Sequence, residues 1–458
     1  MSAGVRNRDV VVLGAGLTGR SLVRWLKRHG ARVRVADSRS DPPPALAEEL
    51  PDVPLATGAF DAATFAGAEM IAISPGVPKD HPAIVEAVAR GVDLVGDVEL
   101  FARALPPQQK VLAITGTNGK TTTTALTGAL ARAAGLATRV AGNIGTPVLD
   151  TLAGIEEGAP WPDLFVLELS SYQLETTGSL KLAAAAVLNV SANHLDRYAG
   201  LADYAAAKAR ILAHCNVAIL NRDDPVVRLM RRRGDTVQTF GASVPQSEEE
   251  WGLVPRAGGE WLARGGELLL PARALALHGR HNAQNALAAL ALTAAVARIR
   301  TPVIDALKAF GGLPHRMQAV ADARGVTFID DSKATTVAAT EAALAGSTRP
   351  VILIAGGDGK GQGFTPLKPA VDAHCRAVLL IGRDAPILER ALAGSPAAVE
   401  SLGTLERAVG RALALAQDGD VVLLSPACAS LDQFANYEAR GERFAELVRT
   451  GLAEAAHA

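Results

Sequence analysis

The stretch VLAITGTNGKTT, at residues 111–122, joins an apolar run to a loop of glycine and hydroxyl side chains. The run predicts a buried β-strand, and the residues after the loop predict the start of a helix. In such a turn, backbone N–H groups surround phosphate oxygens, a lysine reaches the β- and γ-phosphates, and a hydroxyl binds Mg²⁺. The spacing departs from the standard P-loop, because Ile114 stands where its first glycine belongs. The stretch still predicts a site for ATP or GTP, since a turn without a ligand has no need of Lys120 and Thr121. The residues expected around the nucleotide are Gly116, Thr117, Asn118, Gly119, Lys120, Thr121 and Thr122.

A second glycine loop lies near the start of the chain, in VVVLGAGLTG at residues 10–19. It follows an apolar run and precedes a helix expected over residues 20–28, as in folds that bind dinucleotides. The next expected strand, residues 32–36, ends at Asp37, where such folds place the acid that binds a ribose. NAD is the obvious ligand, and the alternative is a scaffold in which the glycines serve only helix–strand packing.

Apolar strand-like runs alternate with alanine- and leucine-rich helical stretches, which predicts an α/β protein with parallel sheets. A chain of 458 residues is too long for a single core. Breaks marked by proline and glycine divide it into three expected domains, residues 1–105, 106–312 and 313–458. The first and third domains are expected to be Rossmann-like. The central one is expected to be P-loop ATPase-like, with a small added β-sheet between about Thr236 and Leu277.

The composition excludes several classes of protein. The formal net charge is −1, so no basic surface is available for nucleic acid or an anionic membrane. No uncharged apolar run approaches the roughly 20 residues needed to span a bilayer, and the N-terminal residues lack the features of a signal peptide. The cysteines are scattered and predict neither a disulfide framework nor a zinc site. We therefore expect a soluble cytoplasmic protein.

Two further strand ends are expected beside the phosphate loop. The apolar run 164–167 ends at Glu168, where a P-loop protein places a Mg²⁺ ligand, although a carboxylate there also suits a helix N-terminus. The run 184–189 is followed by His194, which is either structural or a contact for metal or phosphate. Because both strands are expected to end at the same site, the ligand interpretation is favoured. Lys208, by contrast, has the position of a solvated lysine on an amphipathic helix.

Polar residues also follow three expected strands of the third domain, residues 326–329, 351–355 and 421–424. Parallel strands place their carboxyl ends along one edge of a sheet, so the loops after them are expected to meet. The side chains of Lys333 and Lys360, together with nearby hydroxyl groups, suit a small dicarboxylate. The alternative is that Asp331 and Ser425 only cap helices.

Together, these segments resemble the Mur ligase family, and the resemblance extends over nearly the whole chain. Residues 116–122 are similar to the family's ATP loop, and residues 168–174 and 189–197 are similar to its metal-site segments. Residues 331–335 and 425–430 have the form seen in the family member that adds D-glutamate. The departures are modest: Thr336, Asn193 and Tyr437 replace residues that are more usual in the family.

The resemblance implies an ATP-dependent ligase that adds D-glutamate to UDP-N-acetylmuramoyl-L-alanine through an acyl phosphate, in the synthesis of peptidoglycan precursors. It implies ATP and two Mg²⁺ ions as cofactors, and small molecules rather than nucleic acid or membrane as partners. The first glycine loop would then hold a UDP-linked sugar in place of NAD. We also expect a monomer. The nearer alternatives are another Mur ligase or a folylpolyglutamate synthetase-like enzyme. An NAD-dependent dehydrogenase leaves Lys120 and the lysines of the third domain unexplained.

The resemblance also implies roles for individual residues. The catalytic residues would be Lys120, Glu168, His194 and Lys208, the last as a carbamate. The metal ligands would be Thr121, Glu168, His194 and the carbamate of Lys208. ATP would also contact Asn282, Asn285, Arg316 and Asp331. The UDP-linked substrate would contact Thr18, Asp37, Ser38, Arg39, Ser74, Asn143 and His194. D-Glutamate would contact Lys333, Thr335, Ser430, Leu431 and Tyr437.

Overall fold

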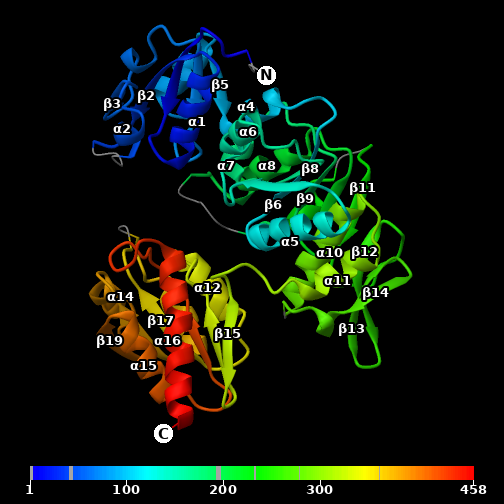
Figure 1. Ribbon diagram of the computed structural model, residues 1–458, viewed down its shortest axis with the longest axis vertical. Helices are drawn as coiled ribbons and strands as arrows, with labels where there is room; N and C mark the ends of the chain where they lie inside the picture. The colour runs from blue at the N-terminus through cyan, green and yellow to red at the C-terminus, as the bar shows by residue number, and fades with distance from the viewer. Residues whose placement is uncertain are drawn as a thin grey trace. The chain divides into compact units, whose positions relative to one another are not determined.

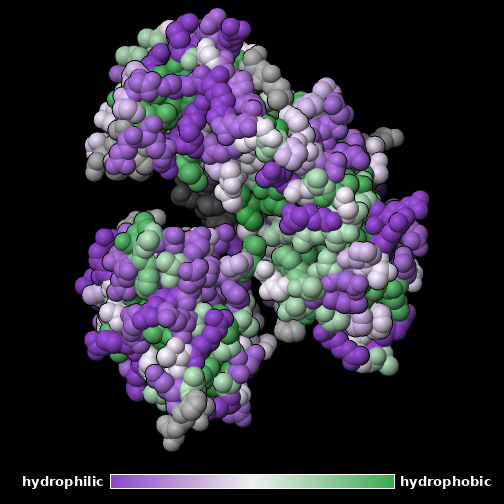
Figure 2. Space-filling view, viewed as in Figure 1, coloured by the Kyte–Doolittle hydropathy of each residue, from purple (hydrophilic) through white to green (hydrophobic). Residues whose placement is uncertain are grey.

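The computed structural model describes residues 4–40, 45–191, 197–231, 234–277, 279–359 and 362–457 (Figure 1). It contains three sheets flanked by helices, so the predicted α/β fold with three domains is confirmed. His194 and Lys360 lie outside the described residues. Among the described residues, no helix combines the length and the apolar character needed to cross a lipid bilayer. On the face shown in Figure 2, hydrophilic side chains are spread over all three domains.

The first sheet has five parallel strands in the order β3-β2-β1-β4-β5. The strands are β1 (Asp9–Leu13), β2 (Arg32–Asp37), β3 (Leu55–Thr57), β4 (Met70–Ile73) and β5 (Asp93–Gly96). Its helices are α1 (Leu17–Arg28), α2 (Ala45–Glu49), α3 (Pro82–Ala89) and α4 (Asp97–Ala104). Because β1 lies between β2 and β4, the strand order reverses at the glycine loop that follows β1. Ligands bind at this switch point in open α/β sheets.

The second sheet has nine strands in the order β14-β13-β12-β11-β10-β9-β6-β8-β7. Its first six strands in sequence are β6 (Lys110–Thr115), β7 (Thr138–Gly142), β8 (Leu164–Glu168), β9 (Ala184–Val187), β10 (Ala218–Asn221) and β11 (Val237–Phe240). These strands pair in parallel, and β6 lies between β8 and β9. The loops that follow β6, β8 and β9 are therefore neighbours at one edge of the sheet.

The extra strands expected between Thr236 and Leu277 are present, and they extend this same sheet. They are β12 (Glu250–Arg256), β13 (Gly259–Arg264) and β14 (Glu267–Pro271), and they pair antiparallel with one another. The helices of this part of the chain are α5 (Lys120–Ala133), α6 (Val148–Glu156), α7 (Ser171–Glu175), α8 (Leu201–Ala209), α9 (Pro225–Arg228), α10 (Arg280–Ala294) and α11 (Thr301–Ala309).

The third sheet has six strands in the order β15-β16-β20-β17-β18-β19, with only β15 antiparallel to its neighbour. The strands are β15 (Gln318–Ala323), β16 (Val326–Asp330), β17 (Val351–Gly356), β18 (Cys375–Ile381), β19 (Ala398–Gly403) and β20 (Val421–Leu424). The helices are α12 (Val337–Ala345), α13 (Leu367–His374), α14 (Ala385–Ala391), α15 (Leu405–Leu415) and α16 (Tyr437–His457). The three strands expected to end in polar loops, β16, β17 and β20, are adjacent.

The first two sheets belong to one compact unit, Met1–Phe310, and the third sheet forms a second unit, Gly311–Ala458. A continuous hydrophobic core joins the first two domains. Within it, the ring of Phe101 on α4 meets the ring of Phe165 on β8 edge to face, with 5.1 Å between their centroids. The domain boundaries expected from the sequence remain predictions.

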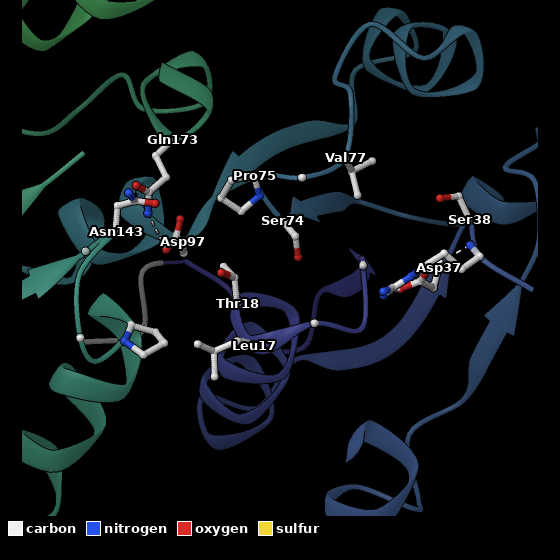
Figure 3. A pocket seen from close by; sticks show the side chains of 17 residues that line it. Leu17, Thr18, Asp37, Ser38, Ser74, Pro75, Val77, Asp97, Asn143 and Gln173 are labelled. Carbon is white, nitrogen blue, oxygen red and sulfur yellow. Dashed lines mark hydrogen bonds and ion pairs between the residues drawn. The ribbon is translucent and has the colours of Figure 1, made fainter. Parts of the chain in front are cut away.

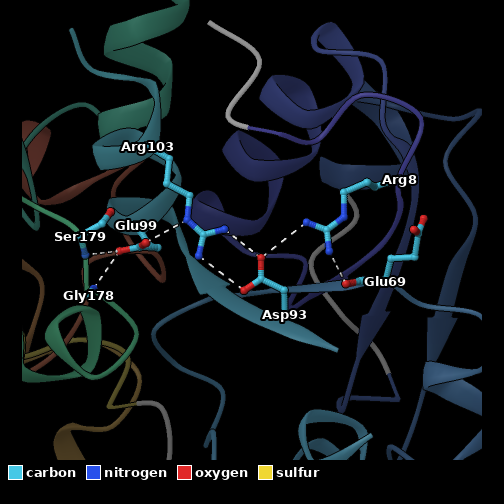
Figure 4. A network of polar contacts seen from close by, with 7 residues as sticks. All are labelled: Arg8, Glu69, Asp93, Glu99, Arg103, Gly178 and Ser179. Carbon is cyan, nitrogen blue, oxygen red and sulfur yellow. Dashed lines mark hydrogen bonds and ion pairs between the residues drawn. The ribbon is translucent and has the colours of Figure 1, made fainter. Parts of the chain in front are cut away.

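A polar network also fastens α4 to the central domain (Figure 4). One carboxylate oxygen of Glu99 accepts hydrogen bonds from the backbone N–H groups of Gly178 and Ser179, at 2.7 and 2.9 Å. Its other oxygen accepts one from Arg103 Nε at 2.9 Å, and Arg103 also pairs with Asp93. Burial raises the pKa of Glu99, but the hydrogen bonds from these three donors outweigh it and hold the pKa below its usual value.

Replacing Glu99 with alanine is expected to lower the free energy of unfolding by about 2–4 kcal/mol, because the buried carboxylate loses its hydrogen bonds from two backbone N–H groups and from Arg103. Since the folded-state pKa is lowered, the contribution of Glu99 is present above the pKa of the unfolded chain and disappears as the pH falls through the folded-state pKa. Urea unfolding at several pH values would measure both effects. Glu86, which forms an exposed ion pair with Arg90, is the control: its alanine variant should lose less than about 0.5 kcal/mol. Equal losses in the two variants would contradict the prediction.

Candidate active site

The predicted phosphate loop joins β6 to α5, as the sequence indicated. Gly119 is the residue before α5 and has a φ angle of 80°, which favours glycine. A Cβ atom there would lie 2.5 Å from Asn285 Oδ1, so a larger residue would have to displace the Asn285 side chain of α10. Asn285 Nδ2 in turn donates to Asn282 Oδ1 at 3.2 Å. The structure thus brings two of the predicted ATP-binding residues to the phosphate loop.

Asn189, just after β9, fixes the shape of this loop. Its backbone oxygen accepts from Thr117 N at 2.9 Å, and its Oδ1 accepts from Asn118 N at 2.8 Å. Its Nδ2 donates to Asn118 O at 3.1 Å. The sequence interpretation gave Asn189 no role, although an asparagine at the end of a strand beside the phosphate loop was a usable signal.

Two lysines meet at one carbonyl oxygen of the loop. Lys120 Nζ donates to Gly116 O at 3.0 Å and Lys208 Nζ donates to the same oxygen at 2.8 Å. Lys208 is 1% exposed, and its Nζ lies 4.4 Å from the centre of the Tyr204 ring. The solvated position that its place in the helix suggested is therefore wrong. Helix α8 turns Lys208 towards the phosphate loop, away from water.

The surroundings of Lys208 favour its neutral amine. The pKa of Lys208 is lowered to about 7, mainly by burial and also by the charge of Lys120, while the charge of Glu168 opposes the shift. At pH 7 about half of such amines are neutral, against roughly one in three thousand for a lysine of ordinary pKa. The neutral amine is the form that adds CO₂, so the site suits the carbamate that the family resemblance implies.

Glu168 at the end of β8 is 2% exposed. Its Oε1 accepts a hydrogen bond from Asn143 Nδ2 at 2.8 Å, whereas its Oε2 is buried and has no hydrogen-bond partner. Burying a carboxylate oxygen without a partner costs folding free energy unless a cation or a hydrogen-bond donor binds it. Thr121, the second residue of α5, carries a hydroxyl group. Oxygen ligands of this kind fit Mg²⁺.

No group of three or more His, Cys, Asp or Glu side chains that could hold a metal occurs in the part of the chain that the structure describes. A metal site here would therefore combine Glu168 with ligands of other kinds, such as the Thr121 hydroxyl and a carbamate on Lys208. His194, also expected as a ligand, lies outside the described residues.

A pocket of about 570 Å³ opens beside the first glycine loop (Figure 3). This volume is in the usual range of small-molecule sites. Six residues expected to contact the UDP-linked substrate line it: Thr18, Asp37, Ser38, Arg39, Ser74 and Asn143. Leu17, Pro75, Val77, Asp97 and Gln173 line it as well. The pocket therefore draws on both the first and the central domain.

The first glycine loop is shaped by a close approach of its own backbone. A Cβ atom at Gly19 would lie 1.7 Å from Gly14 O, so only glycine fits at that position. Gly16 precedes α1 and offers no side chain to cap it. The N–H groups of the first turn are thus open to an anion in the pocket.

Asp37 anchors this loop. Its Oδ2 accepts from Ala15 N at 2.7 Å, and both of its oxygens accept from the Arg39 guanidinium. The hydrogen bond from Arg39 lowers the pKa of Asp37 to about 2, with backbone hydrogen bonds adding to the effect. Asp37 thereby joins the glycine loop to Arg39, and its contact with a substrate remains a prediction.

Asn143 connects the pocket with the phosphate loop. It follows β7, lines the pocket and donates a hydrogen bond to Glu168. The negative charge of Glu168 in turn favours the charged form of Lys208. A group held at the Asn143 end of the pocket would therefore lie near Glu168 and the two lysines.

The loops after β16, β17 and β20 meet in the second unit. Asp331 Oδ2 accepts from Ser425 Oγ at 2.8 Å, and burial raises the pKa of Asp331 to about 7. The alternative that these two residues cap helices is wrong, because Thr336 precedes α12 and makes no side-chain cap, and Ser425 bonds to Asp331. Lys333 Nζ lies 5.6 Å from the centre of the Tyr437 ring.

The remaining residues expected at D-glutamate are distributed along these loops. Ser430 is buried, Thr335 is half-buried and Leu431 is exposed. Arg316 lies close enough to Asp331 to oppose the rise of its pKa. The sequence interpretation missed Arg440, which is 1% exposed and donates to Ser332 O and Cys428 O. An arginine near the start of a helix gives no sequence signal that distinguishes such buried contacts from a solvated position.

Models of three Mur ligase domains match the chain. They are the Mur ligase MurD-like N-terminal domain at residues 8–96, the Mur ligase middle domain at residues 114–293 and the Mur ligase glutamate ligase domain at residues 315–428. Among solved structures, the chain is similar to the UDP-N-acetylmuramate–alanine ligase MurC of Thermotoga maritima, with a TM-score of 0.58 and 18% identity over 97% of this chain and 100% of that one. At this identity, the likeness concerns the fold alone.

Curated relatives are much closer in sequence. The UDP-N-acetylmuramoylalanine–D-glutamate ligase of Thiobacillus denitrificans is 53% identical over 98% of this chain and 98% of its own length. The enzyme of the same name from Methylobacillus flagellatus is 52% identical over 97% of each. With these relatives and the matches to all three domains, the chain belongs to the Mur ligase family.

Proposed function

We propose that the protein is an ATP-dependent amide ligase that joins D-glutamate to UDP-N-acetylmuramoyl-L-alanine, with release of ADP and phosphate. The observation that carries the proposal is the position of Asn143, which lines the pocket beside the first glycine loop and donates to Glu168 at the phosphate loop. A UDP-linked substrate held in the pocket would thus present its far end to ATP. The names of the curated relatives support the choice of substrates.

The reaction begins with activation of a carboxylate, which is a poor electrophile. The carboxylate oxygen of the substrate attacks the γ-phosphorus of ATP, ADP leaves, and an acyl phosphate forms. The amine of D-glutamate then adds to the acyl carbon, the tetrahedral intermediate loses phosphate and a proton, and an amide remains. Lys120 would offset the negative charge that builds up between ATP and the attacking carboxylate. Positioning supplies much of the remaining rate.

Mg²⁺ ions bound here would neutralise phosphate charge during the transfer. Thr121, Glu168 and a carbamate on Lys208 would hold them, and His194 is expected to contribute as a ligand or as a contact for the acyl phosphate. Asn282 and Asn285 would contact the nucleotide together with Arg316 and Asp331 of the second unit. That unit would also bind D-glutamate, through contacts with Lys333, Thr335, Ser430, Leu431 and Tyr437. We infer a monomer that works in the cytoplasm.

The test is an ATP-dependent phosphate-release assay with UDP-N-acetylmuramoyl-L-alanine and a panel of amino acids. D-Glutamate is expected to give phosphate release at least roughly a hundredfold above L-glutamate, D-alanine and diaminopimelate. D-Alanine lacks the side-chain carboxylate, diaminopimelate has a different side chain, and L-glutamate cannot place its amine and both carboxylates on the same partners at once. Omitting ATP should abolish the signal. The substrate assignment would fall if another amino acid gave the signal and D-glutamate did not.

The same assay separates the alternatives. A folylpolyglutamate synthetase-like enzyme would release phosphate with a folate and glutamate in place of the UDP-linked substrate. A dehydrogenase would bind NAD at the first glycine loop with no influence of ATP, and the matches to Mur ligase domains over this loop do not support it.

A further inference from the structure

One wall of the substrate pocket is a turn of the first domain, Ser74–Val77, in which Val77 N donates to Ser74 O at 3.0 Å. The turn lies directly against the glycine loop. Ser74 Oγ would be 3.0 Å from a Cβ atom at Gly14 and 3.3 Å from one at Gly19. Any displacement of the turn therefore changes the space in which the loop can hold an anion.

The turn is held from the central domain by Arg197. Its two terminal nitrogens donate to Pro75 O at 3.3 Å and to Val77 O at 3.2 Å. Pro75 and Val77 lie 122 and 120 residues before Arg197 in the chain. A planar guanidinium with two fixed terminal donors suits such a pair of carbonyl oxygens better than the single nitrogen of an ammonium group.

Arg197 is itself fixed in place. Its NH2 group pairs with Glu175 Oε2 at 3.2 Å, and its guanidinium carbon lies 4.5 Å from the centre of the Tyr172 ring. The side chains of Arg197 and Glu175 are only 12% and 8% exposed. Both partners belong to α7, which begins shortly after Glu168. The side chain of Arg197, fixed by these contacts, thus connects the central domain to the wall of the pocket.

We propose that Arg197 is a positioning residue for the UDP-linked substrate: it holds the Ser74–Val77 turn against the glycine loop and so fixes the cradle for the diphosphate. The assignment of the ligand rests on the proposed function. Arg197 acts through the backbone of Pro75 and Val77 and serves binding in the first domain. Its loss should leave the ATP site and the chemical step largely intact.

The chain offers a matched control in Arg210. Its guanidinium also donates to two backbone carbonyls, Leu174 O at 2.7 Å and Thr177 O at 3.2 Å, but both belong to the central domain. An Arg210→Lys variant therefore loses the same kind of contact with two carbonyl groups, but none of Arg210, Leu174 and Thr177 lines the pocket.

The experiment compares Arg197→Ala, Arg197→Lys and Arg210→Lys with the unsubstituted protein. Calorimetry measures the binding of UDP and of UDP-N-acetylmuramoyl-L-alanine, and steady-state assays measure kcat and the KM values. We expect Arg197→Ala to weaken both ligands about 10- to 100-fold, as for the loss of hydrogen bonds to a charged group. Arg197→Lys should lose less, because it keeps the ion pair with Glu175. The KM for ATP, and kcat at saturating substrate, should stay within about threefold in each variant.

Other outcomes overturn the inference in distinguishable ways. If Arg197→Ala bound both UDP ligands as well as Arg210→Lys does, the positioning role would be excluded. A parallel rise of the KM for ATP would point to a general structural role instead and would equally exclude it. If the alanine variant did not fold, the lysine variant would decide on the same criteria. Failure of the unsubstituted protein to bind UDP or its muramoyl derivative would remove the proposed function itself.

Discussion

An alanine in place of Lys208 is expected to lower kcat by roughly a thousandfold or more, the effect of removing a charge-stabilising group at the reacting phosphate. Lys208 is 1% exposed and has a pKa lowered to about 7, so much of its amine is neutral, the form that would add CO₂ to give the proposed metal-binding carbamate. The fold should survive, because Gly116 O keeps its hydrogen bond from Lys120. Phosphate release measures the activity, and ¹³C NMR with labelled bicarbonate detects the carbamate carbon directly.

Formation of the carbamate on Lys208 is expected to depend on pH. Because the folded-state pKa of Lys208 is lowered, its amine is protonated and unreactive towards CO₂ below about pH 7 and neutral above it. Protein depleted of CO₂ should therefore regain activity faster at about pH 8 than at about pH 6 when both buffers are equilibrated with the same partial pressure of CO₂. Excess bicarbonate should not restore Lys208→Ala. The exposed Lys181 is the control, and its alanine variant should keep full activity. Full activity of Lys208→Ala would reject the carbamate.

The sequence predicted the architecture well where strands are buried on both faces. The strand expected over residues 164–167 is observed as Leu164–Glu168. A parallel strand buried on both faces is a continuous apolar run, so its position is easily read from the sequence. The strand expected over residues 184–189 ends earlier, at Val187, since Asn189 leaves the sheet to bind the phosphate loop. The helix expected from Arg20 begins at Leu17, because Gly16 can precede a helix without a side-chain cap. Local patterns cannot show such contacts between distant segments.

The candidate site was predictable where it follows strand ends and not where it depends on the packing of helices. Glu168 follows from the rule that ligands bind at the carboxyl ends of parallel strands. Lys208 has no such signal, because its partner Gly116 is 92 residues away in the chain and the helical pattern does not reveal which face meets that loop. Arg197 and Arg440 are similar cases, since their carbonyl partners belong to other segments. Only the family resemblance could single out Lys208 beforehand.

Replacing Glu168 with glutamine is expected to lower kcat by roughly a hundred- to a thousandfold. The substitution keeps the shape of the side chain, and its amide oxygen can still accept from Asn143 Nδ2. The change falls on the oxygen that has no hydrogen-bond partner, which becomes an NH₂ group. An NH₂ group cannot bind Mg²⁺, whereas a carboxylate oxygen is a preferred ligand. The loss should therefore appear in every measurement that depends on the metal.

Calorimetric titration of ATP with and without Mg²⁺ provides a readout besides activity. In the unsubstituted protein Mg²⁺ should strengthen ATP binding, and in Glu168→Gln this gain should shrink while metal-free binding stays the same. Glu157, whose side chain is 63% exposed and pairs with Arg28 at the surface, supplies the control glutamine variant. If Glu168→Gln retained the Mg²⁺-dependent gain and full turnover, the unpartnered oxygen would not be a metal ligand. A loss confined to the UDP-linked substrate would assign Glu168, through Asn143, to the pocket instead.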